Sequence, residues 1–374
     1  MKQTLLLTLL FCGFLCGSTS HALDFYDNST EAPHISLIEH AQTSIDIEIY
    51  TMEDAAIRSA ITSAQTRGVK VRIVQEPAPV GASCKIFNAP STKDNAACTD
   101  LRAFVSDVVA KGGTYLPYNK TAFCDGKKTC YEHGKIMIVD GSTALVSTGN
   151  FDSTSICDKN EKISRCNRDF SVVTNDADEV QTLETIFAAD LAGVTYDLKS
   201  LVDAIPSATL TVSPYSLAPL VTFIQTAQIS LQIENQYLKD ADLNQAIIAA
   251  AKRGVNVQVM VSSICAFGKP TASAAKAAAT LANEFSEAGV SARAFTNKMK
   301  VNGKEGYLHA KTIVVDHQTA WVGSVNGSTT ALQVNREYGI FFQDAAPVSA
   351  LSKAMSTDFS DAASTTLLED STCN

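Results

Sequence analysis

The 374-residue sequence lacks a hydrophobic run long enough to cross a membrane. Its longest apolar run, Leu5 to Leu15, is shorter than the roughly 18 to 20 residues that a spanning helix needs. The run follows Met1-Lys2 and precedes Ser20-His21-Ala22, a pattern typical of a secretory signal peptide cleaved near Ala22. We therefore expect a signal peptide at 1–22 and a mature chain that is secreted or periplasmic.

Excess positive charge is also missing. The sequence has 30 Lys and Arg against 39 Asp and Glu, a formal net charge of −9. Loss of Lys2 with the signal peptide would leave 29 basic against 39 acidic residues, or −10. This balance disfavours attachment of the whole surface to nucleic acid or to an anionic membrane, so any phosphate binding has to be local.

Paired Cys-x-x-Cys knuckles are absent, and no cluster of histidines or carboxylates has metal-ligand spacing. We therefore expect no metal and no cofactor. Eight of the ten cysteines follow the signal peptide, and an even number in an exported chain favours disulfides. The cysteines that are neighbours in sequence are Cys84 and Cys98, Cys124 and Cys130, and Cys157 and Cys166, which leaves Cys265 and Cys373. Sequence alone leaves the connectivity open.

What the sequence does contain is an internal duplication. The segment from Tyr131 to Asp140 recurs from Tyr307 to Asp316 with an offset of 176. Residues around the segment repeat as well: Ser44–Glu48 with Ser230–Glu234 at an offset of 186, Asn150 with Asn326 at 176, and Asn167-Arg168-Asp169 with Asn335-Arg336-Glu337 at 168. The decreasing offsets place ten and then eight extra residues in the first half.

The order of predicted elements indicates the fold class. A strand at Ser44–Tyr50, a helix at Asp54–Thr66 and a strand at Val69–Val74 give a β-α-β order, and the second half repeats it. We also predict a helix from Leu101 to Ala110 and a single helix from Glu179 to Leu201. The sequence thus predicts an α/β fold with largely parallel sheets, in two halves at 23–205 and 206–374.

Each copy of the repeat carries the same reactive groups. On a strand, residues i and i+2 project from one face, so His133 with Lys135, and His309 with Lys311, are aimed at one place. A single His-x-Lys is uninformative, but two copies with matched flanking residues are not. Two imidazoles can divide a displacement at phosphorus between a nucleophile and a general acid.

The other polar residues of the repeat receive separate roles. The two lysines with Asn150 and Asn326 would hold the non-bridging oxygens of a phosphate, and Ser324 is a further substrate-binding candidate. Asp169 and Glu337 are predicted to support the far nitrogen of an imidazole. Asp140 and Asp316 end a strand before a turn, where we expect them to pair locally or to cap backbone amides.

The motif His-x-Lys-(x)4-Asp-(x)6-Gly-Gly/Ser-x-Asn, read from His133 to Asn150 and from His309 to Asn326, resembles that of the phospholipase D superfamily. The second copy ends in Gly323-Ser324-Val325-Asn326, whereas the first reads Ser147-Thr148-Gly149-Asn150 and departs at its first glycine. The resemblance implies two pseudo-twofold-related α/β lobes with the active site at their interface. It also implies a covalent phosphohistidine intermediate, with His133 as nucleophile and His309 as acid.

That superfamily includes phospholipases, nucleases, phospholipid synthases and tyrosyl-DNA phosphodiesterases. We expect a secreted phospholipase D, a phosphodiesterase that releases phosphatidic acid and a free headgroup and also carries out transphosphatidylation. Its expected partners are a phospholipid substrate and, transiently, a membrane surface, and the chain is expected to be a monomer that does not bind nucleic acid.

Two alternatives remain open at this stage. The first is a secreted metal-independent nuclease, which a local basic cleft of Lys135, Lys311, Arg168 and Arg336 would favour. The second is a non-catalytic interaction protein, which is disfavoured because both histidines and both lysines are present.

Overall fold

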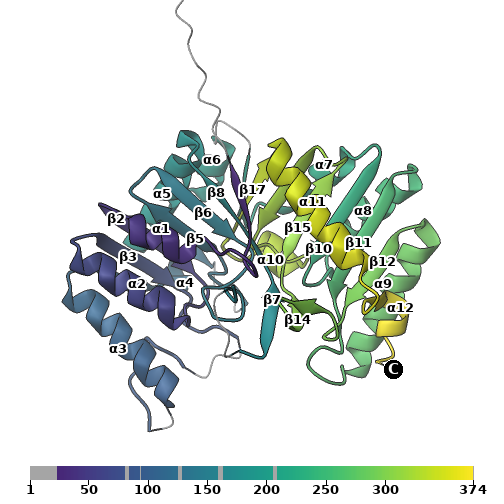
Figure 1. Ribbon diagram of the computed structural model, residues 1–374. Coiled ribbons are helices and arrows are strands. Elements are labelled where there is room, and N and C mark those ends of the chain that lie inside the picture. Colours follow the sequence, from purple (N-terminus) through teal and green to yellow (C-terminus); the bar gives the residue numbers. More distant parts are fainter. Residues whose placement is uncertain are drawn as a thin grey trace, which may run out of the picture.

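The computed structural model describes residues 23–80, 84–92, 94–124, 129–158, 163–204 and 209–373. The predicted signal peptide and the predicted boundary between residues 205 and 206 lie outside these ranges. Figure 1 shows two α/β lobes side by side, the first coloured purple to teal and the second green to yellow. Among the described residues, no helix combines the length and the apolar character that a membrane span requires.

Each lobe is built on one large sheet. The first lobe has seven strands in the order β1 (Asp24–Asp27), β8 (Phe170–Thr174), β6 (Thr143–Ser147), β5 (Lys135–Val139), β2 (Ser44–Ile49), β3 (Lys70–Gln75) and β4 (Thr114–Pro117). The second has eight, in the order β18 (Thr365–Thr366), β12 (Ser291–Phe295), β11 (Asn256–Ser262), β10 (Ser230–Asn235), β15 (Lys311–Val315), β16 (Thr319–Gly323), β17 (Glu337–Phe342) and β9 (Leu210–Ser213).

The sheets are mixed in direction. Strands β2, β3 and β4 are parallel, as are β10, β11 and β12, because a crossover returns the chain to the same edge of the sheet each time. The predicted parallel pairing is found in these two groups of three strands. The motif strands β5 and β15 pair antiparallel with β2 and β10, and each continues through a short turn into an antiparallel hairpin partner, β6 or β16.

Helices pack on both faces of each sheet, which accounts for the apolar runs in the central strands. The outer face of the first sheet is covered by α1 (His34–His40), α2 (Ala55–Thr66) and α3 (Ala96–Ala110). The outer face of the second is covered by α7 (Leu217–Gln225), α8 (Ala241–Lys252) and α9 (Ala272–Ala288). The inner faces carry α5 (Ala177–Ala192) and α11 (Ala345–Ser360).

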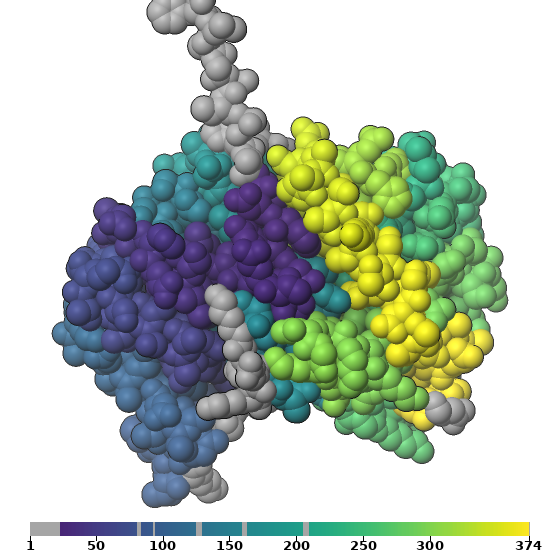
Figure 2. All heavy atoms as spheres, viewed as in Figure 1, coloured from purple at the N-terminus to yellow at the C-terminus, as the bar shows by residue number. Residues whose placement is uncertain are grey.

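The inner layer is one continuous apolar core that both lobes share. It contains Ile136, Val146 and Phe187 from the first lobe together with Val322 and Leu351 from the second. On the surface, the purple N-terminal segment meets the yellow α11 along the seam (Figure 2), consistent with the packing of α11 against β1. A third sheet of β13 (Lys300–Val301), β14 (Lys304–Leu308) and β7 (Arg165–Arg168) also crosses between the lobes.

Two helix predictions need correction. The predicted helix from Glu179 to Leu201 is two helices, because Gly193 adopts a left-handed φ of 66° and ends α5, and α6 (Leu198–Asp203) follows. Helix α3 begins at Ala96, before the predicted Leu101, because Asn95 accepts a hydrogen bond from the Cys98 backbone and caps it. The remaining short helices are α4 (Lys120–Phe123), α10 (Thr329–Gln333) and α12 (Leu367–Asp370).

The eight cysteines within the described residues form four pairs. They are Cys84–Cys98, Cys124–Cys130, Cys157–Cys166 and Cys265–Cys373. The first three close short loops around the first-lobe insertions. The last joins the end of the chain to the segment that follows β11.

Candidate active site

The two histidines lie at equivalent places where the lobes meet. His133 lies two residues before the first residue of β5, and His309 lies two residues before that of β15. The backbone N–H of His133 donates to the carbonyl of Arg336 at 2.9 Å, and that of His309 donates to the carbonyl of Arg168 at 3.1 Å. Each histidine is therefore held by the backbone of the opposite lobe.

The acidic partners are exchanged between the lobes. Nδ1 of His133 lies 2.8 Å from Oε2 of Glu337, which belongs to the second half of the chain. Nδ1 of His309 lies 3.0 Å from Oδ1 of Asp169, which belongs to the first. The sequence identified both acids, but it did not show that each acid contacts the histidine of the opposite lobe. A carboxylate on Nδ1 directs the other ring nitrogen, Nε2, toward a substrate.

Hydroxyl groups support both acids from within their own lobes. Thr148 donates to Oδ1 of Asp169 at 2.6 Å and accepts the Phe170 N–H at 2.9 Å. Its counterpart Ser324 is fully buried, accepts the Tyr338 N–H at 3.0 Å and donates to the Tyr338 carbonyl at 3.4 Å, and its hydroxyl opposes the rise in the pKa of Glu337 that burial causes. The structure thus places Ser324 behind the acid, a position suited to supporting Glu337 rather than to touching a substrate.

Both lysines are fully buried beside the histidines. Nζ of Lys135 donates to the His133 carbonyl at 2.6 Å, and Nζ of Lys311 donates to the carbonyls of His309 and, at 3.2 Å, Thr148. Burial lowers the pKa of Lys135 to about 8 and that of Lys311 to about 7. A bound phosphate would stabilise both ammonium groups, so the lysines are prepared for an anion.

Asn150 and Asn326 have side-chain oxygens that are buried and accept no hydrogen bond from the described residues. A buried amide without a protein partner is costly, so these side chains are available to a ligand. Their substrate-binding role stays a prediction. Asn326 follows Val325 at the end of the second motif, and Asn150 occupies the same place in the first.

The two histidine–acid pairs differ electrostatically. Burial and the charges of the two lysines hold the pKa of His133 well below its usual range, and burial raises the pKa of Glu337 to about 8. Burial also lowers the pKa of His309, but the charge of Asp169 opposes that decrease. Although burial alone would raise the pKa of Asp169, the charge and hydrogen bond of His309 bring it below its ordinary value. The Asp169 pair is the better suited to hold a proton on its imidazole.

Asp140 and Asp316 lie away from the histidines, at the turns after β5 and β15. Asp140 accepts backbone N–H bonds from Gln42, Thr43 and Ser44, at 2.7 to 3.1 Å. Asp316 accepts equivalent bonds from residues 228–230. These bonds hold the motif strand next to β2 or β10, which is the structural role that the sequence suggested.

Arg168 and Arg336 do not join the lysines, contrary to the basic cleft considered above. Both guanidinium groups are engaged by carboxylates, Arg168 by Asp27 and Asp358, and Arg336 by Asp190. Their positive charge is therefore neutralised inside the protein.

Two features of the site escaped the sequence reading. The ring of Tyr50 lies edge-on to His133, 4.6 Å between centroids, and Nζ of Lys135 lies 5.4 Å from its centre. The second motif also has a reason for its glycine: a Cβ on Gly323 would lie 2.5 Å from the Tyr338 carbonyl oxygen and 2.6 Å from the Trp321 ring. In the first lobe Leu145 stands at the position of that tryptophan and Ser147 at that of the glycine.

A family model described as "Cardiolipin synthase, PLD-like domain" matches residues 34–191 and 220–361. A cardiolipin synthase of Listeria welshimeri is 31% identical over 140 residues, covering 37% of this chain and 26% of that enzyme. Cardiolipin synthase 2 of Staphylococcus epidermidis is 24% identical over 344 residues, covering 87% of this chain and 64% of that enzyme. The chain therefore spans less than two thirds of the length of these relatives.

Two solved structures share the fold over most of the chain. Phosphatidylserine synthase of Haemophilus influenzae Rd KW20 superposes with a TM-score of 0.64 at 14% identity, covering 92% of this chain and 87% of that one. Polyphosphate kinase of Porphyromonas gingivalis superposes with a TM-score of 0.58 at 15% identity, covering 91% of this chain and 50% of that one. At these identities the likeness concerns the fold alone.

Proposed function

Because the chain belongs to the phospholipase D superfamily of phosphodiesterases, we propose that it is an exported, monomeric phospholipase D. In this proposal it hydrolyses the distal phosphodiester bond of a phospholipid at a membrane surface, releasing phosphatidic acid and the headgroup alcohol. The observation that carries the proposal is the pair of imidazoles, each with Nδ1 held by a carboxylate from the opposite lobe.

The proposed first step is attack by Nε2 of His133 on phosphorus. The bond from phosphorus to the headgroup oxygen breaks, and His309 donates its Nε2 proton to that oxygen as it leaves. In the second step, water or an alcohol gives a proton to His309 and attacks the phosphohistidine, which frees His133. Lys135, Lys311 and the two asparagines stabilise the charge on the non-bridging oxygens in both steps.

Three observations favour a lipid substrate over nucleic acid. The formal net charge is −9. Both interface arginines are neutralised by buried carboxylates, so the positive charge at the site rests on two lysines. The relatives that match by sequence are named cardiolipin synthases, and that name supports a phospholipid as the substrate proposed here. That name also favours transfer to an alcohol acceptor besides hydrolysis.

The first prediction tests substrate class directly. Mature protein is incubated with phosphatidylcholine and phosphatidylglycerol vesicles, with and without ethanol, and separately with plasmid DNA. We expect phosphatidic acid, and phosphatidylethanol when ethanol is present, because a phosphohistidine accepts either nucleophile. His133→Ala and His309→Ala should each lower turnover by several orders of magnitude, since the two residues act as one unit.

Two outcomes would contradict the phospholipase D proposal. Rapid cleavage of DNA that slows steeply with salt, with no headgroup release from either lipid, would replace the proposal with a nuclease. A folded protein that turns over neither substrate, and that forms no phosphohistidine, would favour an interaction protein.

A further inference from the structure

Arg336 and Arg168 immediately precede the two crossed acids, and their side chains run into the opposite lobe. Nε of Arg336 donates to Oδ2 of Asp190 at 2.8 Å, and Nη2 donates to Oδ1 at 3.1 Å. The geometry is bidentate, which makes it both strong and directional. Tyr196 joins the pair, with its hydroxyl 3.0 Å from Asp190 and 3.1 Å from Nη2 of Arg336.

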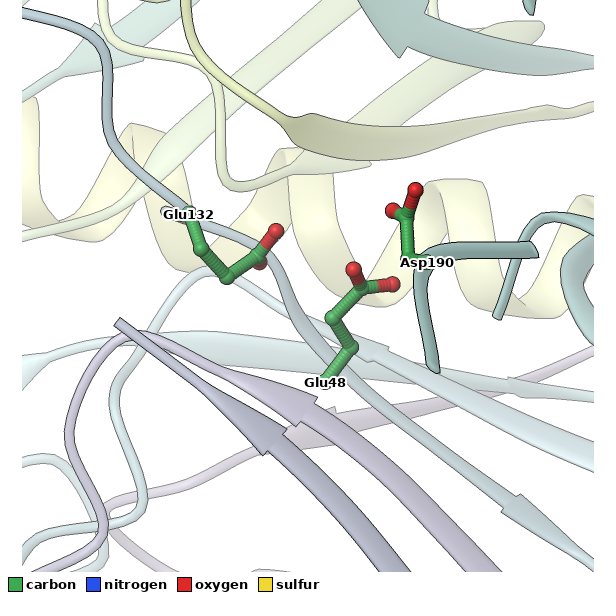
Figure 3. A group of neighbouring side chains, drawn as sticks. All are labelled: Glu48, Glu132 and Asp190. Carbon is green, nitrogen blue, oxygen red and sulfur yellow. The ribbon is translucent and has the colours of Figure 1, made fainter. Parts of the chain in front are cut away.

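Asp190 belongs to a buried cluster with Glu48 and Glu132, in which Glu48 lies between the other two (Figure 3). One oxygen from each carboxylate lies within 4.8 Å of the others, a spacing that could suit a metal ion. Most of the oxygens already have protein donors, however: Tyr338 for Glu48, Gly134 for Glu132, and Arg336 for Asp190. Burial and mutual repulsion raise the pKa of both glutamates well above the usual range, so protons reduce the remaining charge.

The same arrangement occurs around the other arginine. Arg168 donates to Asp358 of α11 at 2.8 Å and to Asp27 of β1 at 2.8 Å, and Glu234 lies near enough to raise its pKa. Asp190 and Asp358 differ by 168, as do the two arginines, and Glu48 and Glu234 differ by 186. The arginine, the helix aspartate that it reaches in the opposite lobe and the strand glutamate therefore belong to the duplication, whereas Asp27 lies in the same lobe as Arg168 and Glu132 corresponds to Leu308.

Each arginine is connected to one histidine through its own backbone and through the next residue. The N–H of Arg336 donates to the Tyr131 carbonyl at 2.9 Å, and its carbonyl accepts the His133 N–H at 2.9 Å. On an extended strand, neighbouring side chains point to opposite faces, so anchoring Arg336 on one face sets the direction of Glu337 on the other. Arg168 has the same relation to Asp169 and His309.

We propose that Arg336 and Arg168 are positioning residues, each of which fixes one crossed carboxylate against one histidine by anchoring its own side chain in the opposite lobe. The proposal rests on the reaction proposed above for the roles of the histidines. Its geometric claim is independent of any substrate. Active-site groups lose efficiency steeply when they are misplaced by about 1 Å, so an anchor one residue away affects the chemistry without touching it.

The test follows the two histidines separately by NMR, using their ring Cε1–H signals during a pH titration of the free protein. His133→Gln and His309→Gln variants assign the signals. The charged groups that face His309 are Asp169, Lys311 and Lys135, and those that face His133 are Glu337, both lysines and His309. None of these is altered in the arginine variants.

Arg168→Met should lower the pKa of His309 by about one unit, because Asp169 raises that pKa in the intact site. The pKa of His133 should not change in this variant. Arg336→Met should shift the pKa of His133 and leave the pKa of His309 unchanged. Lysine at either position should restore part of the effect, and Asp190→Asn should reproduce Arg336→Met if the methionine variant does not fold.

Arg72→Met is the matched control, since Arg72 is also paired with a buried acid, Asp46, but within one lobe. It should leave both histidine titrations unchanged. Folded Arg168 and Arg336 variants that leave both titrations unchanged, or that shift both equally, would refute the proposal.

Calcium or magnesium that raises the melting temperature of the intact protein but not of Asp190→Asn would also overturn it, because the cluster would then be a metal site. Because these readouts need no substrate, they remain valid even if neither phospholipid nor DNA is cleaved.

Discussion

At the scale of single residues, the two motifs supply the same side chains but different environments. Asp169 remains acidic beside His309, whereas burial raises the pKa of Glu337 beside His133 to about 8. A carboxylate that stays ionised favours a protonated imidazole, the form that a general acid needs. A neutral imidazole is the form that a nucleophile needs. The environments thus favour the order that the family resemblance implied, with His133 attacking and His309 protonating.

The second prediction concerns the buried lysines. With pKa values of about 8 and about 7, Lys135 and Lys311 lose their charge as the pH rises through this range. Substrate binding should weaken there, because the phosphate loses its positive partners, so KM should rise severalfold between pH 7 and pH 9. Bound phosphate raises both pKa values, so kcat should change less. Initial rates on a short-chain soluble phospholipid measure both constants.

The control for this experiment is Lys353→Met, which removes an exposed lysine and should leave the pH profile unchanged. A KM that stays constant to pH 9 would mean that the lysines do not hold the phosphate.

At the scale of secondary-structure elements, the two motif strands differ in the residue between histidine and lysine. A Cβ on Gly134 would lie 2.6 Å from Oε1 of Glu132 and 2.7 Å from the Tyr338 ring. The second lobe has Ala310 at this position, and Leu308 there replaces Glu132. The glycine is therefore required by the Glu132 carboxylate and the Tyr338 ring that pack against it, not by the motif itself.

The third prediction follows from this difference. Gly134→Ala should destabilise the protein by about 1–3 kcal/mol, as overpacking of a core does, and should lower kcat by displacing His133. Ala310→Gly is the matched variant and should cost only about 0.5–1 kcal/mol through backbone entropy. Thermal melts and initial rates measure both. If Gly134→Ala keeps the original melting temperature and activity, the close approach of Glu132 is not a constraint.

At the scale of the whole molecule, the lobes are parts of one folding unit. The inner core joins β5, β6 and α5 to β16, β17 and α11, and the histidines complete their partners only across that seam. A lobe alone would expose this apolar face together with unpaired buried acids such as Asp190 and Asp358. Both effects are costly in water.

The fourth prediction is that neither half is stable alone. Residues 23–204 and 209–373, expressed separately, should be insoluble or should melt without a cooperative transition, and their co-expression should restore a soluble heterodimer. Circular dichroism melts and gel filtration test this. A monomeric half with a sharp melting transition would show that the shared core is a docking interface instead.

The sequence by itself determined the α/β class and the duplication, and it singled out the histidines, lysines and acids that the structure brings together where the lobes meet. It could do so because period-2 strands, β-α-β order and repeated motifs are local patterns. The single helix predicted from Glu179 to Leu201 was wrong, because one left-handed glycine ended it. Local helical periodicity does not show where such a residue stops a helix.

Only the tertiary structure decided which acid serves which histidine and where the arginines go. His133 is separated from Glu337 by 204 residues, and Arg336 from Asp190 by 146. Both contacts depend on how two sheets pack face to face, because packing brings distant residues together irrespective of their separation along the chain. The sequence left open a basic cleft that Arg168 and Arg336 would share with the two lysines, because it shows charge but not direction. In the folded chain they point away from the histidines, into the carboxylates of the opposite lobe.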